Sequence, residues 1–179
     1  MKTKNVTLCA LSAAIICVFS VLSFPIGSIP ITLGLFAVIL CGCILPAKSG
    51  VISVVIYILL GLTGLPVFSG FRSGIHVLAG PTGGYIISYI AIAPLSNLIF
   101  RFAEKKKNAV KYFTYLTCSL PLLLICYSVA VMHFSLIMNC GIRQSLAECV
   151  IPFVIFDIIK TIGALLIADS INKKIKFKG

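Results

Sequence analysis

Six stretches of the chain are apolar over lengths that suit membrane helices, and segments rich in glycine, proline or charge separate them. No stretch alternates apolar and polar residues over ten positions, as the strands of a membrane β-barrel would. Helices then satisfy the backbone hydrogen bonds in lipid, and about 20 residues cross about 30 Å of hydrocarbon. The second and third stretches are shorter than this. The pattern predicts one all-α membrane domain over residues 1–179, with six transmembrane helices at about 6–24, 31–45, 50–62, 84–100, 112–138 and 151–171.

Composition supports a membrane protein. Hydrophobic residues make up 60% of the 179 residues and charged residues 11%, and the mean hydropathy is +1.15. Soluble domains typically carry about 25% charged residues. A soluble chain of this length has too little interior to bury so much apolar surface. The sequence therefore indicates an integral membrane protein.

The positions of the basic residues explain the formal net charge of +11. If the N-terminus is cytoplasmic, twelve basic residues fall in cytoplasmic segments: Lys2, Lys4, Lys48, Arg101, Lys105, Lys106, Lys107, Lys111, Lys173, Lys174, Lys176 and Lys178. Arg72 and Arg143 fall outside, and Lys160 lies within the last apolar stretch. This excess predicts that both termini are cytoplasmic, with the basic segments beside anionic lipid headgroups. The charge does not indicate nucleic-acid binding.

The last apolar stretch, IPFVIFDIIKTIGALL (151–166), contains two opposite charges. Asp157 and Lys160 are three residues apart, so they share one face of a helix. They would lie about 9 and 13 Å from its outer end. Such charges are expensive in a membrane and commonly mark functional sites. An ion pair that only fixes helix packing remains open, but we favour a pair that faces an outward cavity and binds a polar ligand. Asp169 is expected to pair with Lys173 near the cytoplasmic boundary.

The segment 61–85 is predicted to be a long, ordered, glycine-rich outer loop between the third and fourth helices. Irregular backbone near a membrane is stable where it is buried in protein or lines a cavity. Its candidate binding residues are Gly80, Thr82, Gly83, Gly84 and Tyr85. The glycines let backbone approach a ligand closely, the threonine can cap the following helix, and the tyrosine supplies a hydroxyl. An outer cap without a ligand is the alternative.

The cysteines and histidines do not form a metal or catalytic pattern. Most of the eight cysteines lie in apolar stretches, where they act as small hydrophobic residues. Cys41-x-Cys43 has no nearby histidine or cysteine that would complete a zinc site. The two histidines lack an H-E-x-x-H partner. No metal, cofactor or enzymatic activity is predicted. Cys140 and Cys149 share the last outer segment, and the sequence leaves a disulfide between them open.

Three motifs carry a resemblance to a known family. GLPVFSGFRSGIHVLAGPTGGY (64–85) resembles the signature of the BioY family, the substrate-binding S components of energy-coupling-factor (ECF) biotin transporters. The segment that begins IPITLG is similar to the first half of that family, and IPFVIFDIIK to its last-helix motif. The resemblance covers about residues 28–168. The chain departs from the family pattern at Gly34, Ser73, His76 and Phe156, which affects pocket contacts and leaves the architecture intact.

The resemblance implies a transport protein of the bacterial cytoplasmic membrane that captures biotin at the outer face. Its expected partners are biotin, membrane lipid, an ECF coupling transmembrane protein and two ATPase subunits. The chain has no G-x-x-x-x-G-K-[ST] motif, so those separate subunits would hydrolyse ATP. Ala10 and Ala14 match the small-x-x-x-small pattern with which the family contacts the coupling protein, and small residues permit close helix approach.

The candidate site suits biotin. The ureido N–H groups need an acceptor, which Asp157 provides, and the ureido carbonyl or the carboxylate needs a cation, which Lys160 provides. Phe68 and Phe71 are expected to shield the ring system and Tyr85 to supply a hydroxyl. Which end of biotin Lys160 contacts remains open. The alternatives are an S component for another vitamin and, with much less support, a membrane enzyme, which would need a nucleophile–base pair or a metal set.

Overall fold

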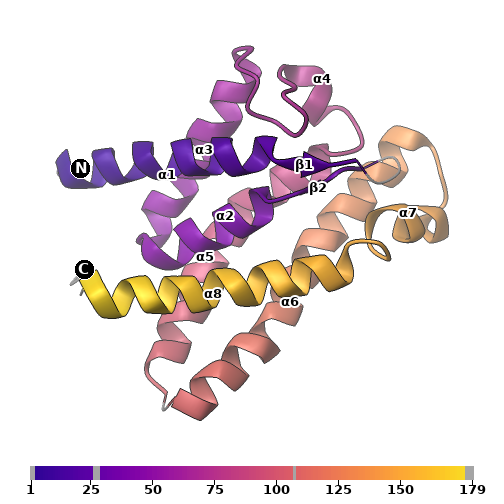
Figure 1. The fold of residues 1–179 in the computed structure, drawn as a ribbon. Coiled ribbons are helices and arrows are strands. Elements are labelled where there is room, and N and C mark those ends of the chain that lie inside the picture. Colours follow the sequence, from indigo (N-terminus) through magenta and orange to yellow (C-terminus); the bar gives the residue numbers. More distant parts are fainter. Residues whose placement is uncertain (1–2, 26–28, 107, 176–179) are drawn as a thin grey trace.

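The computed structural model describes residues 3–25, 29–106 and 108–175. The chain is mostly helical (Figure 1), as the hydrophobic pattern predicts. The helices are α1 (Thr3–Val21), α2 (Gly34–Ile44), α3 (Ala47–Leu62), α4 (Ile75–Leu78), α5 (Gly83–Glu104), α6 (Asn108–Met138), α7 (Ile142–Cys149) and α8 (Val154–Ile175). Two short strands, β1 (Ser23–Phe24) and β2 (Ile31–Thr32), pair antiparallel between α1 and α2.

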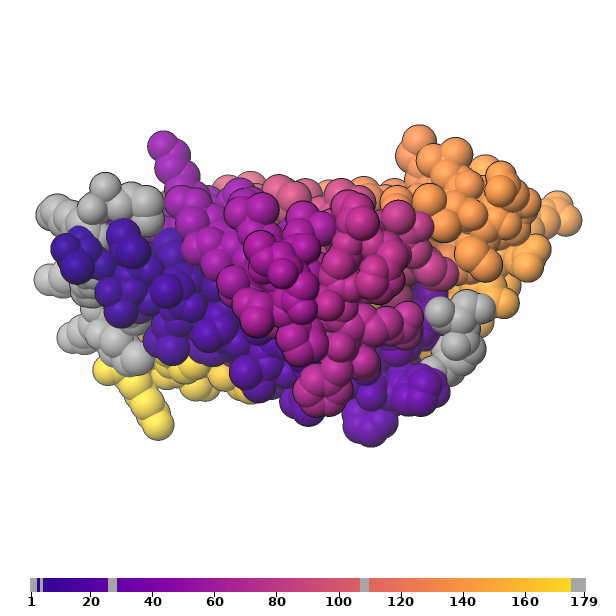
Figure 2. Space-filling model, turned by 90° about the horizontal axis from the view of Figure 1, so that it is seen from above, coloured from indigo at the N-terminus to yellow at the C-terminus, as the bar shows by residue number. Residues whose placement is uncertain are grey.

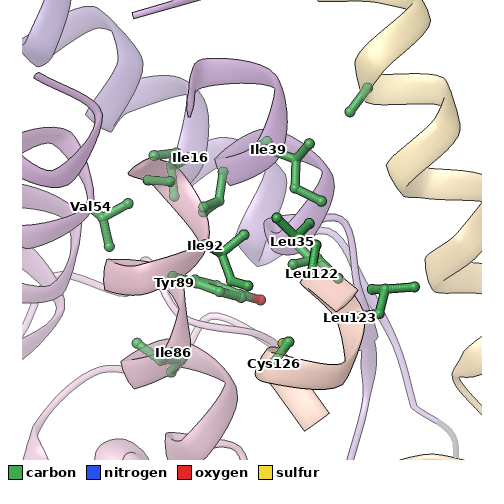
Figure 3. Close-up of a cluster of buried hydrophobic side chains, with 14 of the residues drawn as sticks. Ile16, Leu35, Ile39, Val54, Ile86, Tyr89, Ile92, Leu122, Leu123 and Cys126 are labelled. Atoms are coloured by element: carbon green, nitrogen blue, oxygen red, sulfur yellow. The ribbon is translucent and has the colours of Figure 1, made fainter. Parts of the chain in front are cut away.

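The helices α2 and α5 form the centre of the bundle. The α2 helix packs against α1, α3, α5 and α8, and α5 packs against α2, α3, α4 and α6. Eight of the eleven residues of α2 are buried, as expected for a helix that is apolar on all sides. Figure 3 shows the resulting core, in which side chains from α1, α2, α3, α5 and α6 meet.

A glycine brings the two central helices together. A Cβ atom on Gly42 of α2 would lie 2.5 Å from the carbonyl oxygen of Ala93 in α5 and 3.1 Å from its Cα. No side chain fits in that space, so the two backbones are in direct contact. Small residues at helix crossings allow this approach in membrane bundles.

The connection between α1 and α2 differs from the sequence prediction. The first helix ends at Val21 and not near 24, and the second begins at Gly34 and not near 31. Pro25 explains the early end, because a proline disfavours the helical conformation at the residue before it. The hairpin pairs Ser23 with Thr32 and Phe24 with Ile31. It carries the chain across the end of the bundle and into the site described below.

The last connection also differs, because it contains an extra helix. No helix was predicted in the last outer segment, but α7 occupies Ile142–Cys149 and packs against α6. It carries exposed apolar residues such as Ile142 and Leu146 together with polar ones such as Arg143. A segment of eight residues is too short for its sequence pattern to predict a helix reliably.

Between α3 and α5 the chain folds back on itself. The N–H of Phe68 donates to the carbonyl of Arg72 at 3.0 Å, and the N–H of Gly74 to that of Gly61 at 2.7 Å. Gly74 has φ of +90°, a conformation that other residues rarely adopt. In Figure 2 this purple-to-magenta part of the chain covers the middle of the face seen from above.

Length and composition identify two helices in the described residues that are able to cross a membrane alone, Gly83–Glu104 and Val110–Met138. A third span results if Ile142–Cys149 and Val154–Lys174, which meet at a 52° bend, are one broken span. The other apolar helices, Asn5–Val21, Gly34–Ile44 and Ala47–Leu62, are shorter. The described parts of α1 and α8 place both ends of the chain at the same end of the bundle (Figure 1).

Charged residues tie α6 to α8 at that end. Lys173 donates to Asp169 at 2.9 Å, which confirms the pair expected from their spacing. Lys111 of α6 also donates to this carboxylate, and its side chain is as buried as that of Asp169. The contact of Lys111 with Asp169 was not predicted, because the two residues are 58 positions apart in the sequence and no local pattern links them.

Candidate ligand-binding site

A cavity lies between the hairpin, α2, α5 and α8. Its walls are formed by Ile29, Pro30, Thr32, Leu35, Ser69, Thr82, Tyr85, Tyr89, Phe153, Asp157 and Lys160. The empty space between these wall atoms, including space open to solvent, is about 430 Å³. The part in which the centre of a water molecule fits is only about 40 Å³. The cavity is therefore narrow.

The two charges of α8 lie in this wall and contact each other. Lys160 Nζ donates to Asp157 Oδ1 at 2.9 Å, and their side chains are 10% and 5% exposed. Tyr127 of α6 donates its hydroxyl to Asp157 Oδ2 at 2.8 Å. The carboxylate thus has one donor on each oxygen, and each oxygen retains a lone pair. Asp157 and Lys160 form an ion pair, and both also line the cavity. Each of the two sequence hypotheses, an ion pair between helices and a pair that faces a cavity, therefore describes part of the structure.

The start of α5 contributes Thr82 and Tyr85 to the cavity. Thr82 occupies the N-cap position, but its side chain makes no capping hydrogen bond, so the expected capping role is wrong. The hydroxyl of Tyr85 donates to the carbonyl of Cys149, and its ring packs 6.1 Å from that of Phe153. This contact fixes the end of α7 against α5.

Four of the predicted site residues do not line the cavity. A Cβ on Gly83 would overlap the carbonyl of Leu78, and one on Gly84 would lie 2.8 Å from both Ala130 Cα and His133 Cβ. Gly83 thus leaves room for the end of α4, and Gly84 allows α5 to start in contact with α6. Gly80 lies in the turn before α5, where a Cβ would approach the carbonyl of His76 at 3.0 Å. Their binding role stays a prediction.

Phe68 packs beneath the loop and not in the cavity wall. It is fully buried, and its ring meets that of Tyr57 edge-on at 5.5 Å. The same ring occupies the space that a side chain at Gly61 would need. It anchors the 61–82 segment to α3, and direct shielding of a ligand by Phe68 also stays a prediction.

Sequence reasoning missed seven wall residues: Ile29, Pro30, Thr32, Leu35, Ser69, Tyr89 and Phe153. Tyr89 had a signal, because it lies one helical turn after Tyr85. Phe153 directly precedes the helix that carries Asp157. The hairpin residues had no such sequence signal, because their place in the wall depends on how the hairpin packs over α2.

The eight cysteines are all free. A disulfide between Cys140 and Cys149, which the sequence left open, is absent. Cys140 Sγ instead lies 3.2 Å from the hydroxyl of Ser145, and Cys149 is fully buried. In the described residues no group of three or more histidine, cysteine or acidic side chains is placed to hold a metal ion.

The residues expected to contact a partner lie apart from the cavity. Ala10 and Ala14 are both exposed on α1. Val18 and Leu11 flank them and are 62% and 58% exposed. They form a stripe of small and apolar side chains that no other described part of the chain covers.

Apolar helices around a cavity with a buried ion pair and several hydroxyls define a membrane protein that binds a small polar molecule. The sequence model described as the BioY family matches residues 1–177, and the chain belongs to this family. It is similar to a probable biotin transporter BioY of Pyrococcus horikoshii, with 39% identity over 96% of this chain and 98% of that protein. It is 39% identical to the biotin transporter BioY of Thermotoga maritima, over 89% of this chain and 90% of that one.

The fold is similar to a solved structure described as the S component for biotin from an ECF-type ABC transporter. The TM-score is 0.84 at 28% sequence identity, and the match covers 96% of this chain and 92% of that chain. The family resemblance drawn from the motifs is thereby confirmed. The chain is a membrane transport protein and not an enzyme.

Proposed function

We propose that this chain captures biotin at the outer face of the cytoplasmic membrane and is the S component of an ECF-type ABC transporter. The observation that supports this most directly is the cavity in which Asp157 and Lys160 face the same space as Tyr85 and Thr82. The relatives named as biotin transporters support the choice of biotin. An S component for another vitamin is the second candidate.

The six longer helices, α1, α2, α3, α5, α6 and α8, would be the spans. The α2 helix rises only about 16 Å, so the hairpin before it would occupy the rest of the membrane depth. The termini share one end of the bundle, and the basic residues gather in the segments assigned to the cytoplasm. Both termini would then be cytoplasmic, and the 61–82 segment would be a long outer loop.

The cavity chemistry suits the ureido bicycle of biotin. Asp157 has lone pairs left for the ureido N–H groups, since Tyr127 and Lys160 use one on each oxygen. Phe153 and Leu35 supply apolar surface for the ring system. A site that pairs its buried polar groups with a ligand discriminates strongly against analogues that leave them unpaired.

The narrow cavity indicates that biotin enters by parting its walls. Ile29, Pro30 and Ser69 line the cavity from the segments 25–30 and 61–82. Residues 29–30 and the segment 61–82 would open as a lid and close over the ligand, and residues 26–28, which the same hypothesis includes, lie outside the described residues. Gly80, Gly83 and Gly84 would then act by placing the start of α5, and Phe68 by anchoring the lid.

The energising subunits are separate proteins in this proposal. The exposed stripe of α1 that contains Ala10 and Ala14 would contact the ECF coupling transmembrane protein. Two ATPase subunits would drive the cycle. The remaining apolar surface of the bundle would face membrane lipid.

The test is binding of radiolabelled biotin to the purified full chain, competed with unlabelled biotin, thiamine, riboflavin and lipoate. We expect saturable binding that only unlabelled biotin displaces. Displacement by one of the other vitamins at lower concentration would favour the second candidate. Absence of saturable biotin binding would contradict capture of biotin by this cavity.

A further inference from the structure

A groove separate from the ligand cavity runs between α6 and α7. Its walls are mainly apolar and include Leu124, Val131, Met132 and Leu136 of α6 and Ile142 and Leu146 of α7. The groove is open to the surface, and the part in which the centre of a water molecule fits is about 530 Å³. It lies at the end of the bundle opposite to the described ends of the chain, where α7 packs against α6 (Figure 1). An occupant that fits this groove would gain van der Waals contacts that an empty groove forfeits.

The hydroxyl groups in the groove wall all donate within the protein. Ser128 Oγ donates to the carbonyl four residues earlier at 2.7 Å, and Ser135 Oγ to the carbonyl of Cys140 at 2.7 Å. The third hydroxyl, of Tyr127, donates to Asp157 at 2.8 Å. The described wall thus offers a ligand apolar surface and no free hydroxyl donor. This surface suits an apolar chain.

The groove has the depth of one membrane leaflet. It follows α6 from Leu124 to Leu136, a rise of about 18 Å, and half of the hydrocarbon core is about 15 Å thick. Leu124, Met132 and Leu136 are 64%, 70% and 69% exposed, so no other described element covers this side of α6. A partner helix would follow the whole span of about 30 Å, whereas a lipid acyl chain ends at the middle of the membrane. The groove therefore matches an acyl chain.

A basic residue stands at the end of the groove where a lipid headgroup would lie. Arg143 is exposed and directly follows Ile142, whose side chain lines the groove. Arginine binds phosphate through charge-assisted hydrogen bonds. Glu148, also on α7, lies five positions further on and so about 140° around the helix from Arg143. A phosphate at Arg143 would lie on a different side of α7 from this carboxylate.

We propose that the α6–α7 groove binds a phospholipid, with one acyl chain along α6 and the phosphate at Arg143. The lipid belongs to the leaflet at the α7 end of the bundle. Only the identification of this leaflet as the outer one rests on the proposed function, through the orientation of the chain. The lipid contact itself does not depend on biotin.

The test measures thermal unfolding of the purified, delipidated full chain in detergent at increasing concentrations of dioleoyl phosphatidylglycerol. A ligand that binds only the folded state raises the melting temperature as its concentration rises. The unmodified chain should gain several degrees at saturation. Ser128→Phe would place a ring in the groove from an exposed position and leave the hydrogen bond between Tyr127 and Asp157 in place. This variant should lose most of the gain.

Native mass spectrometry of the same samples counts the phospholipid molecules that stay bound. The lipid-bound fraction of Ser128→Phe should be about tenfold or more below that of the unmodified chain, because a side chain that overlaps the ligand excludes it. Leu146→Trp fills the groove from the wall on α7. It should give the same result, and it carries the test if Ser128→Phe fails to fold.

Thr117→Phe is the matched control. Thr117 is an exposed residue of α6 outside the groove wall, and like Ser128 it donates to the carbonyl four residues earlier. It lies about three turns before Ser128 and so on the same face of the helix. Thr117→Phe should keep both the gain in melting temperature and the bound lipid.

The position of the phosphate is tested with dioleoylglycerol, which has the same chains and no phosphate. Arg143→Gln should weaken binding of dioleoyl phosphatidylglycerol about two- to fivefold, as for an exposed ion pair, and leave binding of dioleoylglycerol unchanged. Equal effects on the two lipids would overturn the contact of the phosphate with Arg143.

Three results would overturn the groove as a lipid site. The first is an unmodified chain that gains no thermal stability from phospholipid. The second is an equal gain in Ser128→Phe, Leu146→Trp and Thr117→Phe. The third is an unmodified chain that is a dimer by native mass spectrometry and that Ser128→Phe converts to a monomer, because a second copy of the chain would then occupy the groove.

Discussion

Replacing Asp157 with asparagine tests the proposed site most directly. Asp157 accepts from Lys160 at 2.9 Å and from Tyr127 at 2.8 Å. Asparagine keeps one acceptor oxygen and loses the charge, so a ureido N–H donor would lose a charged acceptor. Biotin binding should weaken by about 1–3 kcal/mol, which is about 5- to 140-fold in the dissociation constant.

The same substitution affects stability, so the two effects must be separated. Removing one partner of a buried ion pair costs about 3–5 kcal/mol, and the amide oxygen of asparagine favours the lower end because it still accepts from Lys160. The double variant Asp157→Asn with Lys160→Met removes the unpaired charge. It should recover most of the lost thermal stability while biotin binding stays weak.

Asp169→Asn provides the control on the same helix. The side chains of Asp169 and Asp157 are both 5% exposed, and both accept from lysine. Asp169 lies outside the cavity wall, so its replacement should lower the melting temperature and leave the biotin dissociation constant unchanged. Measurements are titration calorimetry and thermal unfolding of the purified full chain. Unchanged biotin affinity in Asp157→Asn, or equal weakening in both variants, would refute the reasoning.

Three other predictions concern packing, coupling and the lid. Gly42→Ala should destabilise the fold by about 1–3 kcal/mol, because its Cβ would lie 2.5 Å from a carbonyl oxygen of α5. Thermal unfolding measures this effect, with Gly163→Ala as the control, since the nearest atom to a Cβ at Gly163 is 3.8 Å away. Equal melting temperatures of the two variants would contradict the prediction. The double variant Ala10→Leu, Ala14→Leu should abolish biotin uptake by cells that express the whole transporter. Biotin binding to the purified chain should stay intact. Normal uptake would show that this stripe does not contact the coupling protein. Saturating biotin should slow hydrogen exchange in residues 61–82, whereas identical exchange rates with and without biotin would argue against a lid.

The residues that the sequence identified are those whose chemistry contrasts with their surroundings. Asp157 and Lys160 stand out as charges in an apolar run, and Tyr85 follows the only G-P-T-G-G segment. The motif resemblance was specific enough to give the family. The role of a glycine was harder to predict from the sequence. The absence of a side chain permits either close approach of a ligand or close contact between helices. Gly83 leaves room for the carbonyl of Leu78, and Gly84 permits the contact of α5 with α6.

The residues that the sequence did not identify depend on tertiary packing. Tyr127 is one of many aromatic positions in a long apolar helix, and only the packing of α6 against α8 directs its hydroxyl to Asp157. Thr32 and Leu35 enter the wall because Pro25 ends the first helix early and a hairpin follows. Local patterns do not encode such contacts between distant elements.

The two polar connections between α6 and α8 restrict how these helices move. Tyr127 bonds to Asp157, and Lys111 bonds to Asp169, twelve residues or about 18 Å further along α8. A rotation of α8 about its axis, or a slide along α6, would break both connections at once and strand buried polar groups. The pair is therefore expected to move as one rigid strut. Opening and closing of the cavity would then come from the hairpin and the α3–α5 segment, while the ion pair keeps its position through the cycle.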